Sequence, residues 1–186
     1  VYTVTKGDGT TATTYPSQRQ GISAFGANSY YFDGGDRFVL TGSGTDSAFD
    51  FGTGDFTIEL WVYHTDIGGE EHYLDANGTG KFYWRKNSDH TMKCQWYSPN
   101  HTNITLTTTT KMAQNVWTHM AVIGRNGTNG EYYINGILET QSAIDYDIVY
   151  NADIIVGMEV SVQGYLQGYL DSLRFSKGIA RYGYTG

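Results

Sequence analysis

The run DFTIELWVY, residues 55–63, alternates apolar and polar side chains along its length and is the clearest strand in the sequence. One set of alternate positions is apolar throughout: Phe56, Ile58, Leu60 and Val62. The other set is mixed: Thr57, Glu59, Trp61 and Tyr63. Because successive side chains of a strand point to opposite faces, we expect the first set to face a core and the second to face a half-hydrated surface. This pattern is typical of one sheet of a sandwich.

Similar short runs rich in β-branched and aromatic residues fill the rest of the chain, with Gly, Asn and Asp between them. They cover residues 29–33, 37–41, 72–76, 81–85, 91–97, 103–109, 117–124, 131–135, 136–140, 153–157 and 168–176. The pair Asn135-Gly136 is typical of a tight β-hairpin. The sequence therefore predicts an all-β fold, a two-sheet antiparallel jelly-roll sandwich with about five to seven strands in each sheet.

Length and charge limit the classes of protein that fit. A chain of 186 residues is expected to form one domain, here residues 26–186. Residues 1–25 are Thr-rich and are predicted to be an N-terminal arm or linker, with packing against the sandwich left open. The net charge of −7 and the scattered Lys and Arg argue against nucleic-acid binding. No apolar run approaches the roughly 20 residues of a membrane span, so no membrane insertion is expected.

The cysteine and the histidines are predicted to have structural roles rather than catalytic or metal-binding ones. Cys94 is the single cysteine, so it cannot form an internal disulfide. It alternates with Met92 and Trp96 and is expected to be a small core residue. The five histidines lack metal-ligand spacing and are predicted to be structural or surface residues: His64, His72, His90, His101 and His119.

Residues 81–97 are predicted to form a hairpin with a loop at 86–90, because an odd loop length brings equivalent faces of the two strands together. One face then carries the apolar side chains of Phe82, Trp84, Met92, Cys94 and Trp96. The other face carries rings, hydrogen-bonding groups and cations, which suit a sugar: Tyr83, Arg85, Thr91, Lys93, Gln95 and Tyr97. An ordinary sheet surface and a protein interface are the alternatives. We take Tyr83, Arg85, Lys93, Gln95 and Tyr97 as candidate ligand-binding residues.

The run GYLDSLRFS, residues 168–176, also reads as a strand, although it lies close to the end of the chain. Strict alternation puts Leu170 and Arg174 on one face and Asp171 and Phe175 on the other. A terminal segment is ordered only where something holds it, so we expect this strand to be part of a sheet.

The order of several motifs resembles the laminin-G-like branch of the concanavalin A-like lectin/glucanase superfamily. The motifs are YYFDGGDRFVL (30–40), FGTGDFTIELWVY (51–63), WTHMAVIG (117–124), EYYINGILE (131–139) and GYLDSLRFSKGIARY (168–182). The resemblance covers roughly residues 28–182. It implies that the last strand pairs beside the early FDG strand. The phrase LRFSKGIARY is also similar to modules of phage and other viral structural proteins.

Some members of this superfamily are glycanases, which need paired carboxylates on one strand face. Glu59 is the single acid of its run, and the adjacent Glu70 and Glu71 face opposite ways. Asp145 and Asp147 alternate, but within a stretch that reads as a loop. We therefore predict surface carboxylates and no enzymatic activity.

The resemblance also implies a structural Ca²⁺, an ion that prefers carboxylate and carbonyl oxygens. Asp171 and the turn that holds Asp33 and Asp36 are the expected ligands. An ordinary Asx-turn in a Gly-rich loop is the alternative for these residues.

Together these features predict a non-enzymatic recognition or display domain on a virion surface, as a tail, fibre or capsid-decoration component. The expected partners are a glycan or cell-surface ligand, other virion proteins, or copies of the same chain. Two alternatives stay open. One is a purely structural assembly or decoration protein that binds no sugar, and the other is a lectin-like module of a secreted, extracellular bacterial protein.

Overall fold

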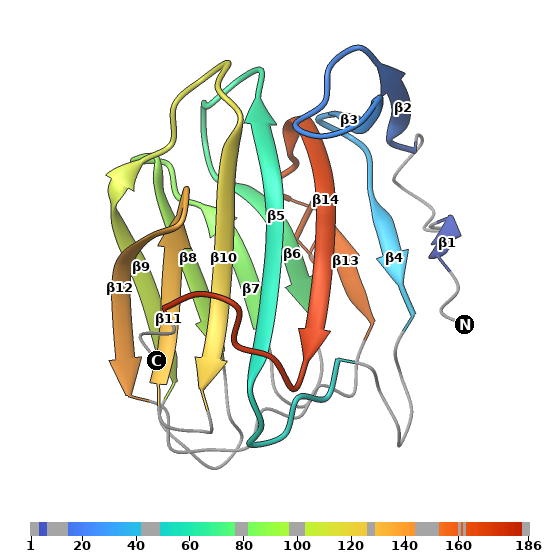
Figure 1. Cartoon of the computed structure of the whole chain (residues 1–186). Helices are drawn as coiled ribbons and strands as arrows, with labels where there is room; N and C mark the ends of the chain where they lie inside the picture. Colours follow the sequence, from blue (N-terminus) through green and yellow to red (C-terminus); the bar gives the residue numbers. More distant parts are fainter. Residues whose placement is uncertain are drawn as a thin grey trace.

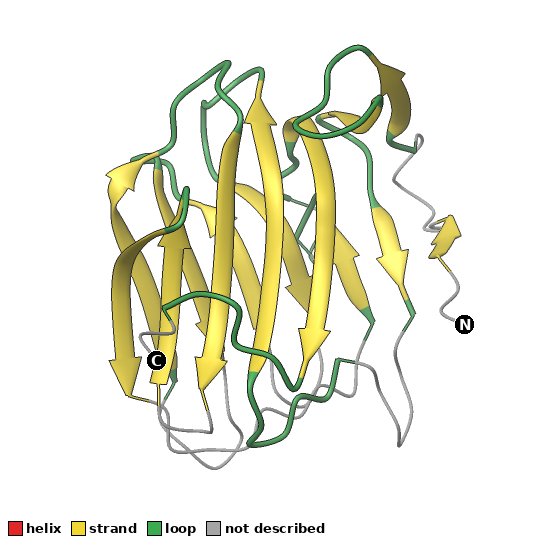
Figure 2. Cartoon of the chain, in the orientation of Figure 1, coloured by secondary structure: helices red, strands yellow, loops and turns green. Residues whose placement is uncertain are grey.

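The structure, a computed structural model, describes residues 4–6, 15–41, 49–76, 82–96, 103–125, 129–143, 153–159, 161 and 163–183. Two antiparallel sheets of seven strands each pack face to face (Figure 1). The described residues contain no helix, and so none that could span a membrane (Figure 2). The prediction of an all-β, two-sheet sandwich is confirmed.

We call the sheet nearer the viewer in Figure 1 the front sheet. Its strand order is β12 (Ile137–Ala143), β11 (Asn129–Ile134), β10 (Thr118–Arg125), β5 (Phe56–His64), β14 (Gln167–Lys177), β3 (Asn28–Asp33) and β2 (Ser17–Gln20). The back sheet has the order β1 (Val4–Lys6), β4 (Phe38–Leu40), β13 (Ile154–Val156), β6 (Glu71–Ala76), β7 (Phe82–Lys86), β8 (Thr91–Trp96) and β9 (Ile104–Lys111). Within the N-terminal 25 residues, β1 and β2 are therefore edge strands of the two sheets.

The core lies between the sheets and contains the apolar positions that alternation predicted. Phe56, Ile58, Leu60 and Val62 of β5 are each at most 1% exposed. Phe82, Trp84, Met92, Cys94 and Trp96 of the β7–β8 hairpin are equally buried. The indole N–H of Trp84 donates to the hydroxyl of Tyr132 across the core at 2.6 Å, which satisfies a polar group that burial would otherwise penalise.

The opposite face of β5 is half-exposed, as expected, at Trp61 and Tyr63. At Thr57 and Glu59 it is buried instead, because the C-terminal segment, residues 178–183, covers it. This segment follows β14 and crosses in front of β5 and β10 (Figure 1). The hydroxyl of Thr57 donates to the carbonyl of Ile179 at 2.7 Å and accepts from the amide of Arg181 at 3.1 Å. Ala180 and Tyr182 pack on a small apolar cluster of Ala121, Ile123 and Tyr133. Thr57 and Glu59 are consequently 0% and 4% exposed.

Strand β14 lies between β5 and β3, so the expected pairing of the last strand beside the FDG strand is confirmed. Strict alternation along β14 is wrong, however. The register with β5 shifts between Asp171 and Arg174, and Ser172 has φ of 52°. A bulge of this kind adds residues on one strand and moves the following side chains to the other face. Leu170 and Phe175 therefore both face the core, while Asp171 and Arg174 share the outer face.

Two hairpins show how loops set register. Asn135 and Gly136 form the predicted two-residue turn between β11 and β12, with φ of 49° and 80°. In the β7–β8 hairpin the faces are as predicted, but the register is not. Lys86 pairs with Met92 inside the sheet, and Asn87 N donates to Thr91 O. The loop is thus residues 87–90 rather than the predicted 86–90. It is a short turn that ends at His90, whose φ is 70°.

Candidate functional site

The outer face of the front sheet carries a row of aromatic side chains that runs across four neighbouring strands. Tyr169 of β14 pairs in register with Tyr31 of β3 on one side and with Tyr63 of β5 on the other. Trp117 immediately precedes β10 and continues the row. The ring centroids are 4.9, 5.8 and 5.6 Å apart from Tyr31 to Trp117. We call these four residues the aromatic row.

A hollow of about 630 Å³ lies on the same outer face. Its lining combines rings with charged and polar groups: Phe25, Glu59, Trp61, His119, Ser172, Leu173, Arg174 and Tyr182. Trp61 lies two residues from Tyr63 on the same face of β5, so the hollow and the aromatic row are continuous. Trp61 has its centroid 5.1 Å from the Phe25 ring and 5.2 Å from the His119 ring.

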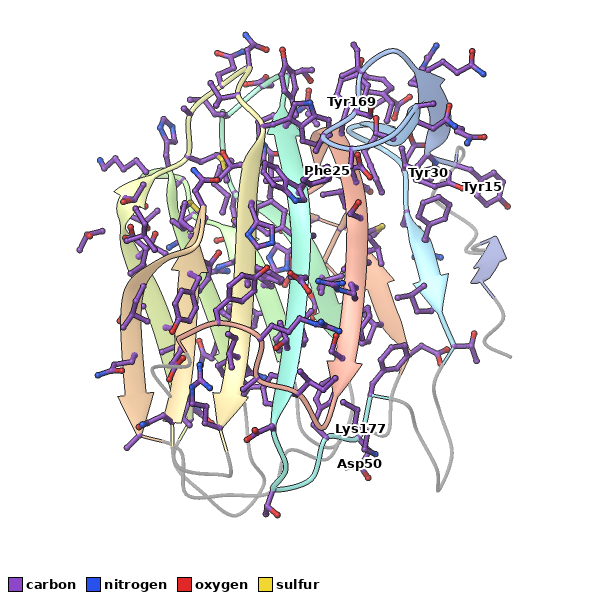
Figure 3. All side chains as sticks on the ribbon, viewed as in Figure 1. Tyr15, Phe25, Tyr30, Asp50, Tyr169 and Lys177 are labelled. Atoms are coloured by element: carbon purple, nitrogen blue, oxygen red, sulfur yellow. The ribbon has the colours of Figure 1, made fainter. Side chains whose placement is uncertain are left out.

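Phe25 reaches the hollow because the loop between β2 and β3 is held against β14. One carboxylate oxygen of Asp171 accepts from the amides of Ala24 and Phe25, at 2.9 and 3.0 Å. The Phe25 ring is nevertheless 61% exposed. Figure 3 places Phe25 and Tyr169 at the same end of the front sheet, with Lys177 at the opposite end. An exposed ring on an anchored backbone is a surface that a ligand can stack on without reordering the loop.

Glu59 is the charged centre of the hollow. Its Oε2 accepts from the hydroxyl of Tyr182 at 2.6 Å and from Nε2 of His119 at 3.2 Å. Its Oε1 accepts from Nε of Arg174 at 2.6 Å and also pairs with the terminal nitrogen of that side chain. Nε of Arg181 lies 3.6 Å from the same oxygen. Strands β5, β10 and β14 and the C-terminal segment thus all converge on one carboxylate.

These contacts determine the protonation of the carboxylate. Burial by itself would raise the pKa of Glu59, but the hydrogen bonds from His119, Tyr182 and Arg174 outweigh burial and lower that pKa to about 2. Burial and the bond to Glu59 raise the pKa of Tyr182 to about 12. Glu59 is therefore an anion and Tyr182 a neutral donor at neutral pH. The earlier interpretation of Glu59 as a surface carboxylate is wrong, because the C-terminal segment encloses it.

Chemically, the hollow offers ring faces beside fixed hydrogen-bonding groups. The Arg174 side chain is 52% exposed although it is held by Glu59, so its remaining N–H groups can reach a ligand. Ring faces of this kind pack against the C–H face of a sugar, while donors and acceptors at the edge bond its hydroxyls. A concave surface that combines aromatic rings with oriented polar groups is typical of ligand sites.

The predicted ligand-binding face of β7 and β8 is on the outside of the back sheet, and its side chains already engage one another. Tyr83 donates to Gln95, and the cationic ends of Arg85 and Lys93 lie 4.9 and 5.4 Å from the centre of its ring. Arg85 also donates to Glu70 at 2.6 Å. The Tyr83 ring, which was expected to stack on a sugar, is therefore already in contact with these two cations. Tyr97 lies outside the described residues, and sugar binding by this face stays a prediction.

The three expected calcium ligands do not form one site. Asp171 Oδ2 is engaged by the two loop amides, Asp36 Oδ2 accepts from Asp33 N at 3.1 Å, and Asp33 Oδ1 accepts from Gly35 N at 3.0 Å. Asp33 pairs with Gln167, four residues along β14 from Asp171, which separates the two by roughly 13 Å at about 3.3 Å per residue. Among the described residues, no group of three or more His, Cys, Asp or Glu could hold a metal ion.

The other acidic candidates also differ from expectation. Glu71 is 1% exposed and pairs with Lys86 inside the sandwich, so it is not a surface carboxylate. Glu70 is on the outer face of the back sheet with Arg85 and His72. Asp145 and Asp147 lie outside the described residues. The residues that make the hollow were missed, although alternation in β5 had already placed Trp61 and Tyr63 on an outer face.

Comparison with known proteins agrees with this architecture. Residues 33–179 match the Laminin_G_3 family, described as the Concanavalin A-like lectin/glucanases superfamily. A search of curated protein sequences finds no match.

Many solved structures are similar to the chain. The binding domain of Paraclostridial Mosquitocidal Protein 1 is 15% identical with a TM-score of 0.69, and the match covers 90% of this chain and 44% of that one. Domain 4 of AbnA, a GH43 extracellular arabinanase from Geobacillus stearothermophilus, in complex with arabinotriose, is 17% identical with a TM-score of 0.69, with 96% and 82% covered. A heptameric SAP-like pentraxin from Limulus polyphemus is 11% identical with a TM-score of 0.56, with 78% and 73% covered. Identities this low show a shared fold, and the chain spans under half the length of the first of these proteins.

Proposed function

The chain belongs to the concanavalin A-like lectin/glucanases superfamily, and from this premise we propose that it is a non-enzymatic carbohydrate-recognition domain. The observation that carries the proposal is the hollow on the front sheet, where the exposed ring of Phe25 and the indole of Trp61 stand beside Glu59 and Arg174. The arabinotriose complex of a domain with the same fold supports a sugar as the ligand class.

The state of Glu59 supports binding rather than hydrolysis. A glycanase needs one carboxyl group with a raised pKa to protonate the leaving oxygen and a second carboxylate on the other side of the bond. The pKa of Glu59 is lowered to about 2, so this group holds no proton to donate near neutral pH. Both of its oxygens already accept hydrogen bonds from the protein. A carboxylate held in this way orients neighbouring donors towards a ligand.

The biological setting belongs to the same proposal. Two of the similar structures are a toxin binding domain and a domain of an extracellular enzyme. They favour a recognition module within a larger secreted or surface-displayed protein. Display on a virion surface, with other virion proteins or copies of the same chain as partners, stays a prediction, and so does calcium binding. No step of the proposal depends on a metal ion.

A glycan array followed by calorimetric titration of the best ligand tests the proposal. Phe25→Ala is expected to weaken binding at least about tenfold, because truncating an aromatic hot-spot contact typically costs about 2 kcal/mol or more of binding free energy. The melting temperature should change little, since the Phe25 ring is 61% exposed.

Tyr83→Ala is the matched control, because it removes a ring from the outer face of the opposite sheet. The expected result is unchanged affinity for this variant. If Tyr83→Ala weakens binding while Phe25→Ala does not, the site is on the back sheet and our assignment is wrong. A domain that binds no glycan on the array would favour the purely structural role.

A further inference from the structure

The aromatic row extends the apolar surface of the front sheet well beyond the hollow. It runs across the strands from Tyr31 through Tyr169 and Tyr63 to Trp117, and each neighbouring pair of rings is within 5.8 Å. All four side chains are partly exposed. At its β3 end the guanidinium of Arg19 lies 5.5 Å from the centre of the Tyr31 ring. A single sugar unit would cover only one or two of these rings.

From this geometry we infer that the ligand is an extended, neutral glycan chain that lies across the strands, rather than one terminal sugar. The inference rests on the proposed function and names the class of ligand for the same site. Successive sugar units would pack on successive rings, and the tyrosine hydroxyls would bond to hydroxyls along the edge of the chain. The neighbouring hollow, entered at Trp61, would hold the unit at one side of the chain.

The strand pairing argues against a peptide as the occupant. An extended peptide commonly binds a sheet by adding to an edge strand, where backbone N–H and C=O groups are free. Strands β3, β14, β5 and β10 are interior strands, and each is paired on both sides. A peptide lying across them could form no ladder of main-chain hydrogen bonds. A glycan needs none, because it binds through ring faces and side-chain groups.

The charge distribution argues for a neutral glycan. The chain carries a net charge of −7, which repels an anionic polymer. Arg19 is the one charged group among the described contacts of the aromatic row, and it is at the end of the row. Arg174 in the hollow is already paired with Glu59. In the part of the chain that the structure describes, no run of cations therefore follows the row, as an anionic chain would require.

The test measures affinity against chain length. Calorimetric titrations would use the disaccharide and the hexasaccharide of four neutral β-1,4-linked series, built from glucose, xylose, mannose and N-acetylglucosamine. In at least one series we expect the hexasaccharide to bind at least about tenfold more tightly than the disaccharide. Tyr169→Ala should remove most of that gain, and Phe25→Ala should weaken both lengths. Thr107→Ala, at an exposed position of β9 on the opposite sheet, should leave the affinity for both lengths unchanged.

The failures of the two proposals can be told apart. Equal affinity for both lengths, or a length gain that persists in Tyr169→Ala, overturns the extended-chain inference and leaves sugar binding intact. Binding of only charged or branched glycans on the array overturns it as well. If no glycan binds in either experiment, the proposed function itself fails. Circular dichroism of Tyr169→Ala must match the parent, and if this variant does not fold, Tyr63→Phe and Trp117→Ala test the same row.

Discussion

Replacing Lys86 by Met is expected to lower the free energy of unfolding by about 3–5 kcal/mol, the usual cost of breaking a buried ion pair. The ammonium of Lys86 is completely buried. It donates to the carbonyls of Ile67 and Gly69 at 2.9 and 2.6 Å and lies 3.5 Å from Glu71 Oε1. Methionine has a similar length but no donor. The variant would leave two carbonyls and a buried carboxylate without their cation.

The neighbouring groups cannot replace that cation fully. The other carboxylate oxygen of Glu71 contacts His64 Nδ1 at 3.0 Å and accepts from the amide of Gln167 at 3.1 Å, so those partners are already used. Urea denaturation of the parent and of Lys86→Met would measure the change. Lys177→Met is the control, because Lys177 is exposed at the end of β14 and should shift stability by less than about 0.5 kcal/mol (Figure 3). A loss below about 1 kcal/mol for Lys86→Met would contradict the assigned role.

Acid is expected to remove about 3 kcal/mol of stability through Glu59 alone. The pKa of this group falls from 4.5 to about 2 on folding, and each unit corresponds to about 1.4 kcal/mol. Because the folded state has the lower pKa, the unfolded state binds the proton more readily between these values. The stabilisation is therefore complete above about pH 4.5 and is lost as the pH falls towards about 2.

Comparison with Glu59→Gln isolates this contribution, since other carboxyl groups titrate in the same range. At neutral pH the variant should be about 3 kcal/mol less stable than the parent, and the difference should shrink as the pH falls from 5 to 2. Tyr182→Phe removes one of the three donors to Glu59 and should give a smaller loss with the same pH dependence. A difference between parent and Glu59→Gln that stays constant from pH 7 to pH 2 would refute the role of the carboxylate.

Short-range patterns were sufficient to predict most of the strands. Alternation identified the core face of β5 and both buried faces of the β7–β8 hairpin, because one buried face of a strand leaves a period of two in the sequence. Asn135-Gly136 predicted its turn because only residues that tolerate positive φ fit there. The edge strands β1 and β2 were not predicted, since they are short and lack that pattern.

Features that break the period were not predictable. The bulge between Asp171 and Arg174 reverses the faces of β14, and nothing in the local sequence marks where the shift occurs. The register of the β7–β8 hairpin depends on the positive φ of His90. In this register Lys86 lies in β7 and faces the interior of the sandwich, and it is not part of the loop. Both errors came from applying regular alternation through an irregular backbone.

The sequence by itself therefore determined an all-β sandwich, its family and most of its core, because these depend on local periodicity and on the order of motifs. The tertiary structure alone decided where the candidate site is. The aromatic row takes residues from positions 31, 63, 117 and 169, and only the register of β3, β14 and β5 and the place of Trp117 just before β10 align them. Glu59 is buried only because a segment more than 100 residues later in the chain folds back across it. Long-range contacts of this kind leave no period in the sequence, since the partners are adjacent in space and distant along the chain.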